Sequence, residues 1–377
     1  MNAKIEGWIK RLKPLYHALL GLRSAVLGTY MRLCHRLCGV DGRKVAFSSF
    51  KGALCNDSPR AIAEALRELR PDVDIVFQLK DGAERPAWAR AAKPRSLRWL
   101  KELATAKVTV DNFNRPYYQI TFPDQRYVQT WHGDRGFKRV LFDAFPDEGY
   151  PDNRYMSLAV AGSDFCERMY RTAFRYDGEV LKTGLPRNDC LLHPMDKAEA
   201  CRKCDLPQDK KIALYAPTFR DADAGSAFRA EFDPAKAVDA LKQATGEDWV
   251  FVSRAHDQNT SVAGAMLDRT DYPEMADLMQ AADLLITDYS SCAGDFPLLL
   301  RPVILYHSRA AYDRELYFDI EKSPFRIAHN EQELYALFRD LNGAAENDRA
   351  ILDFFGTHET GRSARDVAER ICQWLDK

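Results

Sequence analysis

The chain has 377 residues, of which 46% are apolar and 29% charged, and its formal net charge is -1. A chain of this length usually folds around more than one hydrophobic core, which predicts two domains. The composition is that of a water-soluble globular protein. The near-zero net charge argues against a general polyanion binder such as a nucleic-acid-binding protein, and it leaves local segregation of charge open.

Residues 1–38 form a basic segment with seven lysines and arginines against a single acid, Glu6. Apolar residues recur at helical spacing before and after Pro14: Ile5, Trp8, Ile9, Leu12, Leu15, Leu19, Leu22 and Val26. No uncharged run approaches the roughly 20 residues that a membrane-spanning helix needs. The pattern is typical of a helix that lies in the interface of an anionic membrane. The alternative is a helix that packs on the body of the protein with its charges in water.

Between residues 44 and 182, short apolar segments alternate with amphipathic ones. The predicted strands cover residues 44–50, 74–79, 107–110, 127–130, 157–161 and 179–182, and the predicted helices cover residues 60–69, 96–104 and 163–174. Alternation of this kind predicts βα units and a mostly parallel sheet. Ligands of such sheets bind beyond the carboxyl ends of the strands.

Polar clusters follow three of these predicted strands, at residues 111–113, 131–139 and 183–189. His132 is the most suggestive residue among them, because it lies just past a strand and basic side chains follow it. A histidine in this place could act as a general base toward a hydroxyl group, since its free pKa lies near neutrality. The alternative is a histidine that is simply hydrogen-bonded in a turn.

From Asp189 to Asp209 the pattern loosens, and we place the end of the first domain there. This stretch contains the C-x-x-C pair Cys201 and Cys204. A structural zinc site would need a second pair of ligands, and none with suitable spacing follows. We therefore interpret the nine cysteines as reduced, buried thiols of a cytosolic protein, and no secretory signal is visible.

A second βα series follows, with predicted strands at residues 211–216, 248–253, 284–286 and 302–306. Three of these strands end near Arg220, His256 and the turn Asp288–Ser291. The turn precedes a predicted helix at residues 293–300, and N–H groups at a helix N-terminus favour phosphate. Arginine and histidine beside it are charge-assisted donors that suit a diphosphate. Each feature alone has an ordinary structural explanation, but three at one sheet edge favour a ligand site.

Four sequence blocks together resemble the CDP-glycerol glycerophosphotransferase family, which includes teichoic-acid glycerol- and ribitol-phosphate transferases and capsule polymerases. The blocks occur in the family's order at residues 128–133, 181–189, 215–221 and 286–296. The resemblance implies an α/β fold of the GT-B type, with two Rossmann-like domains whose parallel sheets face a cleft. We expect an amphipathic segment at 1–40, an acceptor-side domain at 41–200, and a CDP-donor domain at 201–377 whose C-terminal helix returns to the first domain.

The resemblance also implies transfer of an alditol phosphate, with glycerol phosphate expected first, from a CDP-activated donor to an acceptor hydroxyl with release of CMP. The donor is a substrate, and neither a cofactor nor a metal is expected. His132 would be the catalytic base, and Asp288 would orient the phosphate turn. The donor-binding residues implied are Pro217, Thr218, Arg220, His256, Ser290 and Ser291. The residues implied in or behind the cleft are Trp131, Gly133, Arg187 and Asp295.

Two positions depart from the family's pattern. Asp134-Arg135 stands where the family has Thr-Pro, so we expect a charge pair in the loop beside the base that alters contacts with the acceptor. His256-Asp257 stands where the family has His-Pro, which removes a fixed bend and adds a negative charge near the diphosphate. Both departures bear on the identity of donor and acceptor more than on the reaction.

The resemblance implies a lipid-linked or oligomeric polyol-phosphate or glycan acceptor, and a cytoplasmic place on the inner face of the cell membrane. Two alternatives stay open. A GT-B glycosyltransferase would use the same phosphate-binding groups with a nucleotide sugar. A non-catalytic, membrane-docked scaffold would keep the fold for binding alone.

Overall fold

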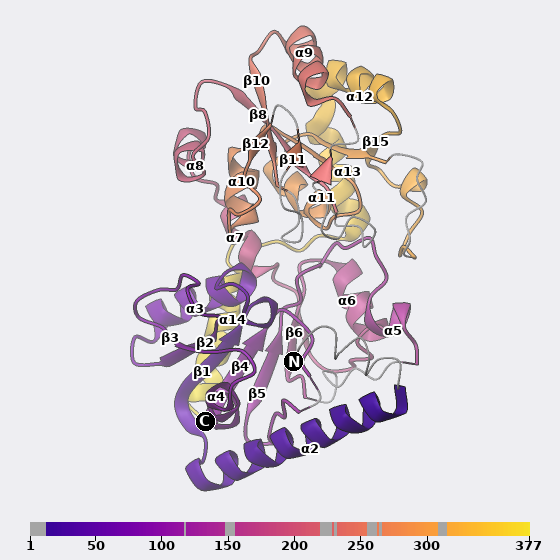
Figure 1. Cartoon of the computed structure of the whole chain (residues 1–377). Helices are drawn as coiled ribbons and strands as arrows, with labels where there is room; N and C mark the ends of the chain where they lie inside the picture. The colour runs from indigo at the N-terminus through magenta and orange to yellow at the C-terminus, as the bar shows by residue number, and fades with distance from the viewer. Residues whose placement is uncertain are drawn as a thin grey trace.

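The computed structural model describes residues 13–116, 118–147, 155–218, 228–229, 232–254, 262–263, 266–307 and 315–377. This part of the chain forms two α/β units, one above the other in Figure 1, each built around its own parallel sheet. The strand order is β3-β2-β1-β4-β5-β6-β7 in the first sheet and β12-β10-β8-β13-β14-β15 in the second. The predicted pair of Rossmann-like domains is confirmed.

The first sheet consists of β1 (Asp41–Ser48), β2 (Asp74–Gln78), β3 (Arg90–Ala92), β4 (Ala106–Asp111), β5 (Arg126–Gln129), β6 (Leu158–Val160) and β7 (Val180–Leu181). Its helices are α3 (Asp57–Leu69), α4 (Leu97–Thr105), α5 (Leu141–Ala144) and α6 (Asp164–Thr172). All six predicted strands of this half are present. The edge strand β3 escaped prediction because its three residues, Arg-Ala-Ala, carry no apolar run.

The second sheet consists of β8 (Lys211–Ala216), β10 (Trp249–Ser253), β12 (Leu267–Asp268), β13 (Leu284–Thr287), β14 (Val303–Tyr306) and β15 (Arg326–Ala328), and β9 (Phe228–Arg229) pairs with β11 (Val262–Ala263) apart from it. Its helices are α7 (Asp189–Leu192), α8 (Lys197–Lys203), α9 (Pro234–Thr245), α10 (Met275–Ala281), α12 (Glu331–Leu337) and α13 (Ala344–Phe355). Cys201 and Cys204 are buried in its apolar core, and all nine cysteines are free thiols. Cys38 is exposed, so the expectation that all nine are buried is wrong.

The predicted helix at residues 293–300 is wrong in extent. The structure has a four-residue helix α11 (Cys292–Asp295), followed by a 3₁₀ turn (Phe296–Leu299). Pro297 lies in the middle of the predicted range, where it has no N–H to donate and disfavours helical geometry in the residue before it. The segment therefore changes from α-helical to 3₁₀ geometry after Asp295.

The chain ends in the first domain. Helix α14 (Ser363–Leu375) packs beside α3, and Figure 1 shows this yellow helix among the indigo elements of the N-terminal half. Val367, Ala368 and Ile371 are fully buried there in one core with Val45 and Ile62. The C-terminal helix therefore completes the core of the first domain, although the second domain lies between them in the sequence.

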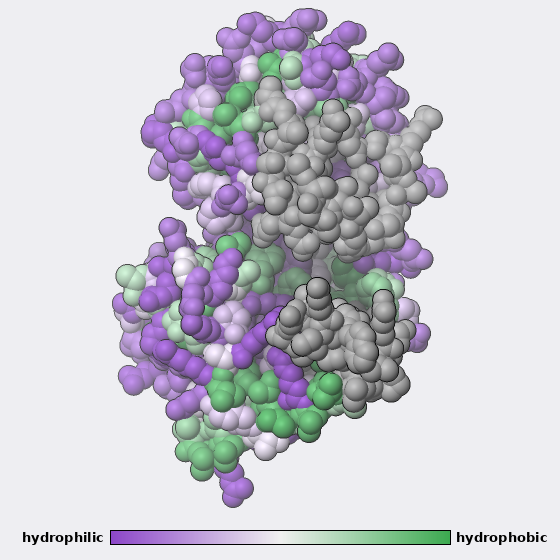
Figure 2. Space-filling model, viewed as in Figure 1, coloured by the Kyte–Doolittle hydropathy of each residue, from purple (hydrophilic) through white to green (hydrophobic). Residues whose placement is uncertain are grey.

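The N-terminal helix α2 (Lys13–Cys38) packs on α4 through the buried residues Met31 and Cys34. The face of α2 that packs on α4 is not the apolar face that the sequence predicted. Leu22, Val26, Leu33 and Leu37 are 63%, 59%, 52% and 72% exposed. Figure 2 shows apolar surface at the lower edge of the molecule, where α2 runs in Figure 1. No helix in the described ranges has the length and apolar character to cross a bilayer. Residues 1–12, with the apolar positions expected there, lie outside the described residues.

Candidate functional site

His132 lies in the loop after β5, at the carboxyl edge of the first sheet. Its half-buried ring stacks on Phe113 with 4.9 Å between centroids and 4° between planes, and lies 4.3 Å from the ring of Trp131 and 5.4 Å from that of Phe50. Trp131 has a left-handed backbone, with φ +52°, and its N–H donates to Oε1 of Gln129 at 2.8 Å. The aromatic contacts and the strained backbone together fix the direction of the imidazole.

The hydrogen bond of His132 decides which ring nitrogen is basic. Nδ1 lies 2.7 Å from the carbonyl oxygen of Asn112, and a carbonyl only accepts, so Nδ1 carries the hydrogen and Nε2 keeps its lone pair. Burial lowers the pKa of His132, and Arg187 and Lys51 act in the same direction, while Asn112 and Asp57 oppose them. The imidazole is therefore neutral at pH 7, in the form that can accept a proton.

Arg187 connects the loop of His132 to the second domain. It lies in the 3₁₀ turn after β7 and donates to the carbonyl oxygen of His132 at 2.8 Å. The same guanidinium pairs with Asp57 at 2.9 Å and with Asp295 of α11 at 2.8 Å. Two of the residues predicted in or behind the cleft, Arg187 and Asp295, are thus in direct contact. Gly133, also predicted there, follows His132 directly and is half-buried.

The charge pair Asp134-Arg135 is buried, so neither side chain is placed to contact an acceptor directly, and an effect on acceptor contacts stays a prediction. The side chain of Arg135 is fully buried and pairs with Asp295 at 2.7 Å and with Glu359 at 2.8 Å. Asp134 accepts the N–H of Gly162 at 2.6 Å. A buried charge is tolerated only when it is paired, and these partners come from both domains and from the C-terminal segment. The pair is part of the domain interface.

Glu359 is a buried residue of this interface that no sequence motif indicated. It accepts from Arg135, from the amide of Asn188 at 2.9 Å, and from the N–H of Leu185 at 2.9 Å. Burial raises its pKa to about 7, although Arg135 opposes the shift. Gly184 makes room for it, because φ is +105° there and a Cβ would lie 2.4 Å from Oε2 of Glu359.

The turn that the sequence assigned to the donor phosphates follows β13 and is held by Asp288. One oxygen of this carboxylate accepts the N–H groups of Thr218 and Tyr289, both at 2.7 Å, and also the hydroxyl of Thr218. Thr218 and the adjacent Pro217, both half-buried, follow β8. The two strand ends that the sequence assigned to the donor are therefore joined through one side chain.

Ser290 and Ser291 are half-buried and stand directly before α11. The hydroxyl of Ser290 accepts from the thiol of Cys292 at 3.2 Å and from its N–H at 3.5 Å, while Ser291 makes no capping bond with its side chain. Because α11 has only four residues, its dipole is weaker than the predicted helix implied. Arg220 and the pair His256-Asp257 lie outside the described residues.

One group of side chains in the described part of the chain could hold a metal ion: His307, Glu321 and His329, whose ligand atoms lie within 4.8 Å of one another. Nδ1 of His329 bonds the carbonyl oxygen of His307 at 3.0 Å, which leaves Nε2 toward Glu321 at 3.4 Å. His307 also bonds the hydroxyl of Tyr289. The two histidines follow β14 and β15, and no spacing motif pointed to them. Independence from metal stays a prediction.

The family model for CDP-glycerol:poly(glycerophosphate) glycerophosphotransferase matches residues 29–373. The teichoic acid glycerol-phosphate transferase of Staphylococcus aureus (strain NCTC 8325 / PS 47) is 28% identical over 370 residues, which cover 88% of this chain and 92% of that protein. The teichoic acid poly(glycerol phosphate) polymerase of Bacillus subtilis (strain 168) is 27% identical, and the match covers 98% of this chain and 54% of the polymerase. The solved structure of the wall teichoic acid polymerase TagF has the same fold, with a TM-score of 0.78 and 24% identity over 99% of this chain and 98% of that one.

Proposed function

The chain belongs to the CDP-glycerol:poly(glycerophosphate) glycerophosphotransferase family, and from this premise we propose that it moves glycerol phosphate from CDP-glycerol to an acceptor hydroxyl. The product grows by one alditol phosphate, and CMP is released. Relatives of the chain include transferases of glycerol phosphate and of ribitol phosphate. Glycerol phosphate is proposed because a glycerol-phosphate transferase is similar to this chain over nearly the whole of both proteins.

In the proposed reaction, the acceptor hydroxyl attacks the phosphorus that carries glycerol. A P–O bond to the acceptor forms while the P–O bond to CMP breaks, and Nε2 of His132 takes the hydroxyl proton. The neutral imidazole, with Nδ1 bonded to Asn112 and Nε2 unprotonated, supports this role. CMP leaves with the negative charge of the broken bond.

The donor diphosphate is proposed to bind at the turn after β13. Ser290 and Ser291 would donate from their hydroxyl and N–H groups, and Arg220 and His256 would supply charge-assisted donors. Thr218, whose own N–H and hydroxyl donate to Asp288, would line the site. Asp288 is proposed as a positioning residue, because its carboxylate oxygen already serves Thr218 and Tyr289. No step requires it to exchange a proton.

The observation that best supports a shared site is the double role of Arg187. It donates to the carbonyl oxygen of His132 and pairs with Asp295, which lies four residues past Ser291. The proposed base and the proposed donor turn are thereby held at a fixed separation across two domains. In-line displacement needs such a separation, because a shift of about 1 Å can cost roughly a hundredfold in rate.

We further propose that the protein works at the cytoplasmic face of the membrane on a lipid-linked or oligomeric acceptor. The exposed apolar residues Leu22, Val26, Leu33 and Leu37 of α2 support this, since exposed basic side chains flank them, including Arg32. A helix with this combination is suited to an anionic interface.

Turnover with defined donors tests the proposal against its alternatives. We expect CMP from CDP-glycerol and an oligo(glycerol phosphate) acceptor, and product mass increased by one glycerol phosphate for each transfer. A nucleotide-sugar glycosyltransferase would release a nucleoside diphosphate and add a sugar. A non-catalytic scaffold would bind CDP-glycerol, which would raise its unfolding temperature, but it would not release CMP.

A further inference from the structure

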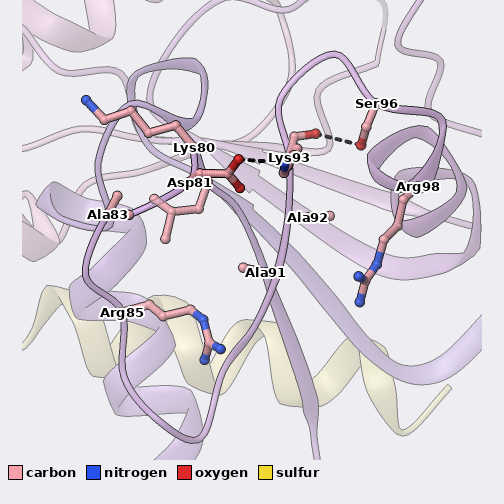
Figure 3. A pocket seen from close by; sticks show the side chains of 11 residues that line it. Lys80, Asp81, Ala83, Arg85, Ala91, Ala92, Lys93, Ser96 and Arg98 are labelled. Atoms are coloured by element: carbon pink, nitrogen blue, oxygen red, sulfur yellow. Dashed lines mark hydrogen bonds and ion pairs between the residues drawn. The ribbon is translucent and has the colours of Figure 1, made fainter.

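A basic pocket of about 420 Å³ lies at the carboxyl ends of β2 and β3, outside the site described above. Its charged lining consists of four basic side chains and one acid: Lys80, Arg85, Lys93, Arg98 and Asp81. Figure 3 shows Arg85 and Arg98 on opposite sides of the segment Ala91–Ala92. Asp81 pairs with Lys93 at 2.5 Å. Lys80, Arg85 and Arg98 remain as an excess of positive charge, so the pocket as a whole is cationic. In a chain of net charge -1, this is a local segregation of charge.

The pocket is linked to His132 through a short series of hydrogen bonds. The N–H of Lys80 donates to the carbonyl oxygen of Gly52 at 2.9 Å, in the turn after β1. Phe50 in the same turn donates its N–H to the side chain of Asn112 at 2.8 Å, and the carbonyl of Asn112 holds His132. In the sheet, β2 is separated from β5 by three strand spacings, or roughly 14 Å.

The turn between the pocket and His132 is tightly shaped and carries one more cation, Lys51. Phe50 and Lys51 have left-handed backbones, with φ of +47° and +58°. At Gly52, φ is +84° and a Cβ would lie 2.7 Å from Pro94. Surrounding structure must impose such a backbone. The Nζ of exposed Lys51 lies 4.1 Å from the centroid of the Phe113 ring, the ring on which His132 stacks.

We infer that Lys51 and the basic pocket bind successive phosphodiester groups of a polyanionic acceptor chain whose terminal hydroxyl reacts at His132. Phosphodiester oxygens take charge-assisted hydrogen bonds from lysine and arginine, and arginine can bind them in bidentate fashion. The pocket lies roughly 14 Å from the strand end of His132. It therefore binds phosphates of the acceptor chain that precede the terminal unit, whose hydroxyl reacts. Affinity for the acceptor should therefore grow with acceptor length. The inference rests on the proposed function for the identity of the chain that binds.

The test measures binding and turnover separately, on the full chain. Fluorescent oligo(glycerol phosphate) of two and of eight units is titrated with the wild type and with the Lys93→Gln/Arg98→Gln double variant. We expect the affinity for the eight-unit chain to fall roughly tenfold and the affinity for the two-unit chain to change less than twofold. The matched control is Lys242→Gln/Arg349→Gln in the second domain. Lys242 is 61% exposed and pairs with Asp248 at 2.6 Å, much as Lys93 is 66% exposed and pairs with Asp81.

The turnover arm uses the same proteins with CDP-glycerol. We expect a higher KM for the eight-unit acceptor in the pocket variant, with an unchanged kcat and an unchanged KM for CDP-glycerol. If the wild type released no CMP, the proposed function would fail, while length-dependent binding would still support the pocket.

Two results would overturn the inference. One is equal affinity of the wild type and the pocket variant for the eight-unit chain. The other is loss of binding to vesicles of anionic phospholipid with unchanged binding of the oligomers, since the pocket would then hold lipid head groups. Wild-type, length-dependent affinity in the variant Lys93→Arg/Arg98→Lys, which keeps both positive charges, would support binding of the acceptor through charge.

Discussion

Arg187 of the first domain and Asp295 of the second form a largely buried ion pair, with 2.8 Å between Nη2 and Oδ2, and the same guanidinium donates to the carbonyl oxygen of His132. The loop that carries the proposed base is therefore held by a contact that exists only when the two domains meet. Arg135 strengthens the same junction through Asp295 and Glu359. The proposed catalytic geometry and the domain arrangement thus depend on one set of buried charges.

Arg187→Gln should lower kcat by roughly 10- to 100-fold, because the loop of His132 loses its support while the donor turn stays intact. The positive charge of Arg187 lowers the pKa of His132. The acidic limb of the pH profile should therefore move to higher pH in the variant, which mere loosening of the fold would not produce. Thermal unfolding is measured in parallel, since Asp57 loses its ion-pair partner and Asp295 keeps only Arg135. A wild-type rate and pH profile would contradict a positioning role.

The pH dependence of the wild type should reflect His132. Burial lowers its pKa below the usual 6.5, and the base acts only when it is deprotonated. The ratio kcat/KM for CMP release should be constant near pH 7–8 and should fall about tenfold per pH unit below a midpoint lower than 6.5. A midpoint above 6.5 would mean that another group controls the rate.

Asp348→Asn should stabilise the protein above neutral pH. Asp348 in α13 is fully buried, and neither carboxylate oxygen has a hydrogen-bond partner among the described residues. Burial raises its pKa from 3.8 to about 7, with Arg326 opposing the shift. The folded state therefore binds the proton more tightly, so stability falls as the pH rises from about 4 to about 7.

Urea unfolding at pH 5 and at pH 8 measures this effect. The substitution should stabilise the protein by about 2 kcal/mol more at pH 8 than at pH 5. The control Asp353→Asn, at an exposed position of the same helix, should change neither value. An equal effect of Asp348→Asn at both pH values would show that ionisation is not involved.

The exposed face of α2 should carry membrane affinity. Leu22→Ser, Val26→Ser and Leu33→Ser together should weaken binding to anionic vesicles at least tenfold and leave thermal stability nearly unchanged, because each of these side chains is more than half exposed. Met31→Ser is the opposite control. Met31 is fully buried against α4, so its replacement should lower stability. If the triple variant sedimented with vesicles as the wild type does, this face of α2 would have no role in membrane binding.

The strands that carry the site could be predicted because buried parallel strands such as β5, β8 and β13 are short apolar runs with polar residues at their carboxyl ends. His132 and Asp288 were proposed as site residues in this way. The short strands β3, β12 and β15 lack such runs and were missed. The change of winding at residues 292–299 depends on the position of Pro297, which apolar spacing alone overlooks.

The domain interface could not be predicted from local pattern. Arg135 and Glu359 are separated by 224 residues, and each is unremarkable in its own stretch of sequence. A charge pair in a loop usually faces solvent, and only the meeting of both domains with the C-terminal segment buries this one. The basic pocket was missed for a different reason: its cations all lie within residues 80–98, but they are interspersed with acidic and apolar residues in a chain that is nearly neutral.

The most direct test of the proposed mechanism is the rate of CMP release from CDP-glycerol by His132→Gln, with an oligo(glycerol phosphate) acceptor. His35→Gln is a matched control, because His35 also bonds a backbone carbonyl through Nδ1, at 3.0 Å, and also stacks on a phenylalanine, far from the site. We predict that His132→Gln lowers kcat roughly a thousandfold with unchanged binding of CDP-glycerol, and that His35→Gln keeps the wild-type rate. CMP release near the wild-type rate by His132→Gln would contradict the assignment of His132 as the base.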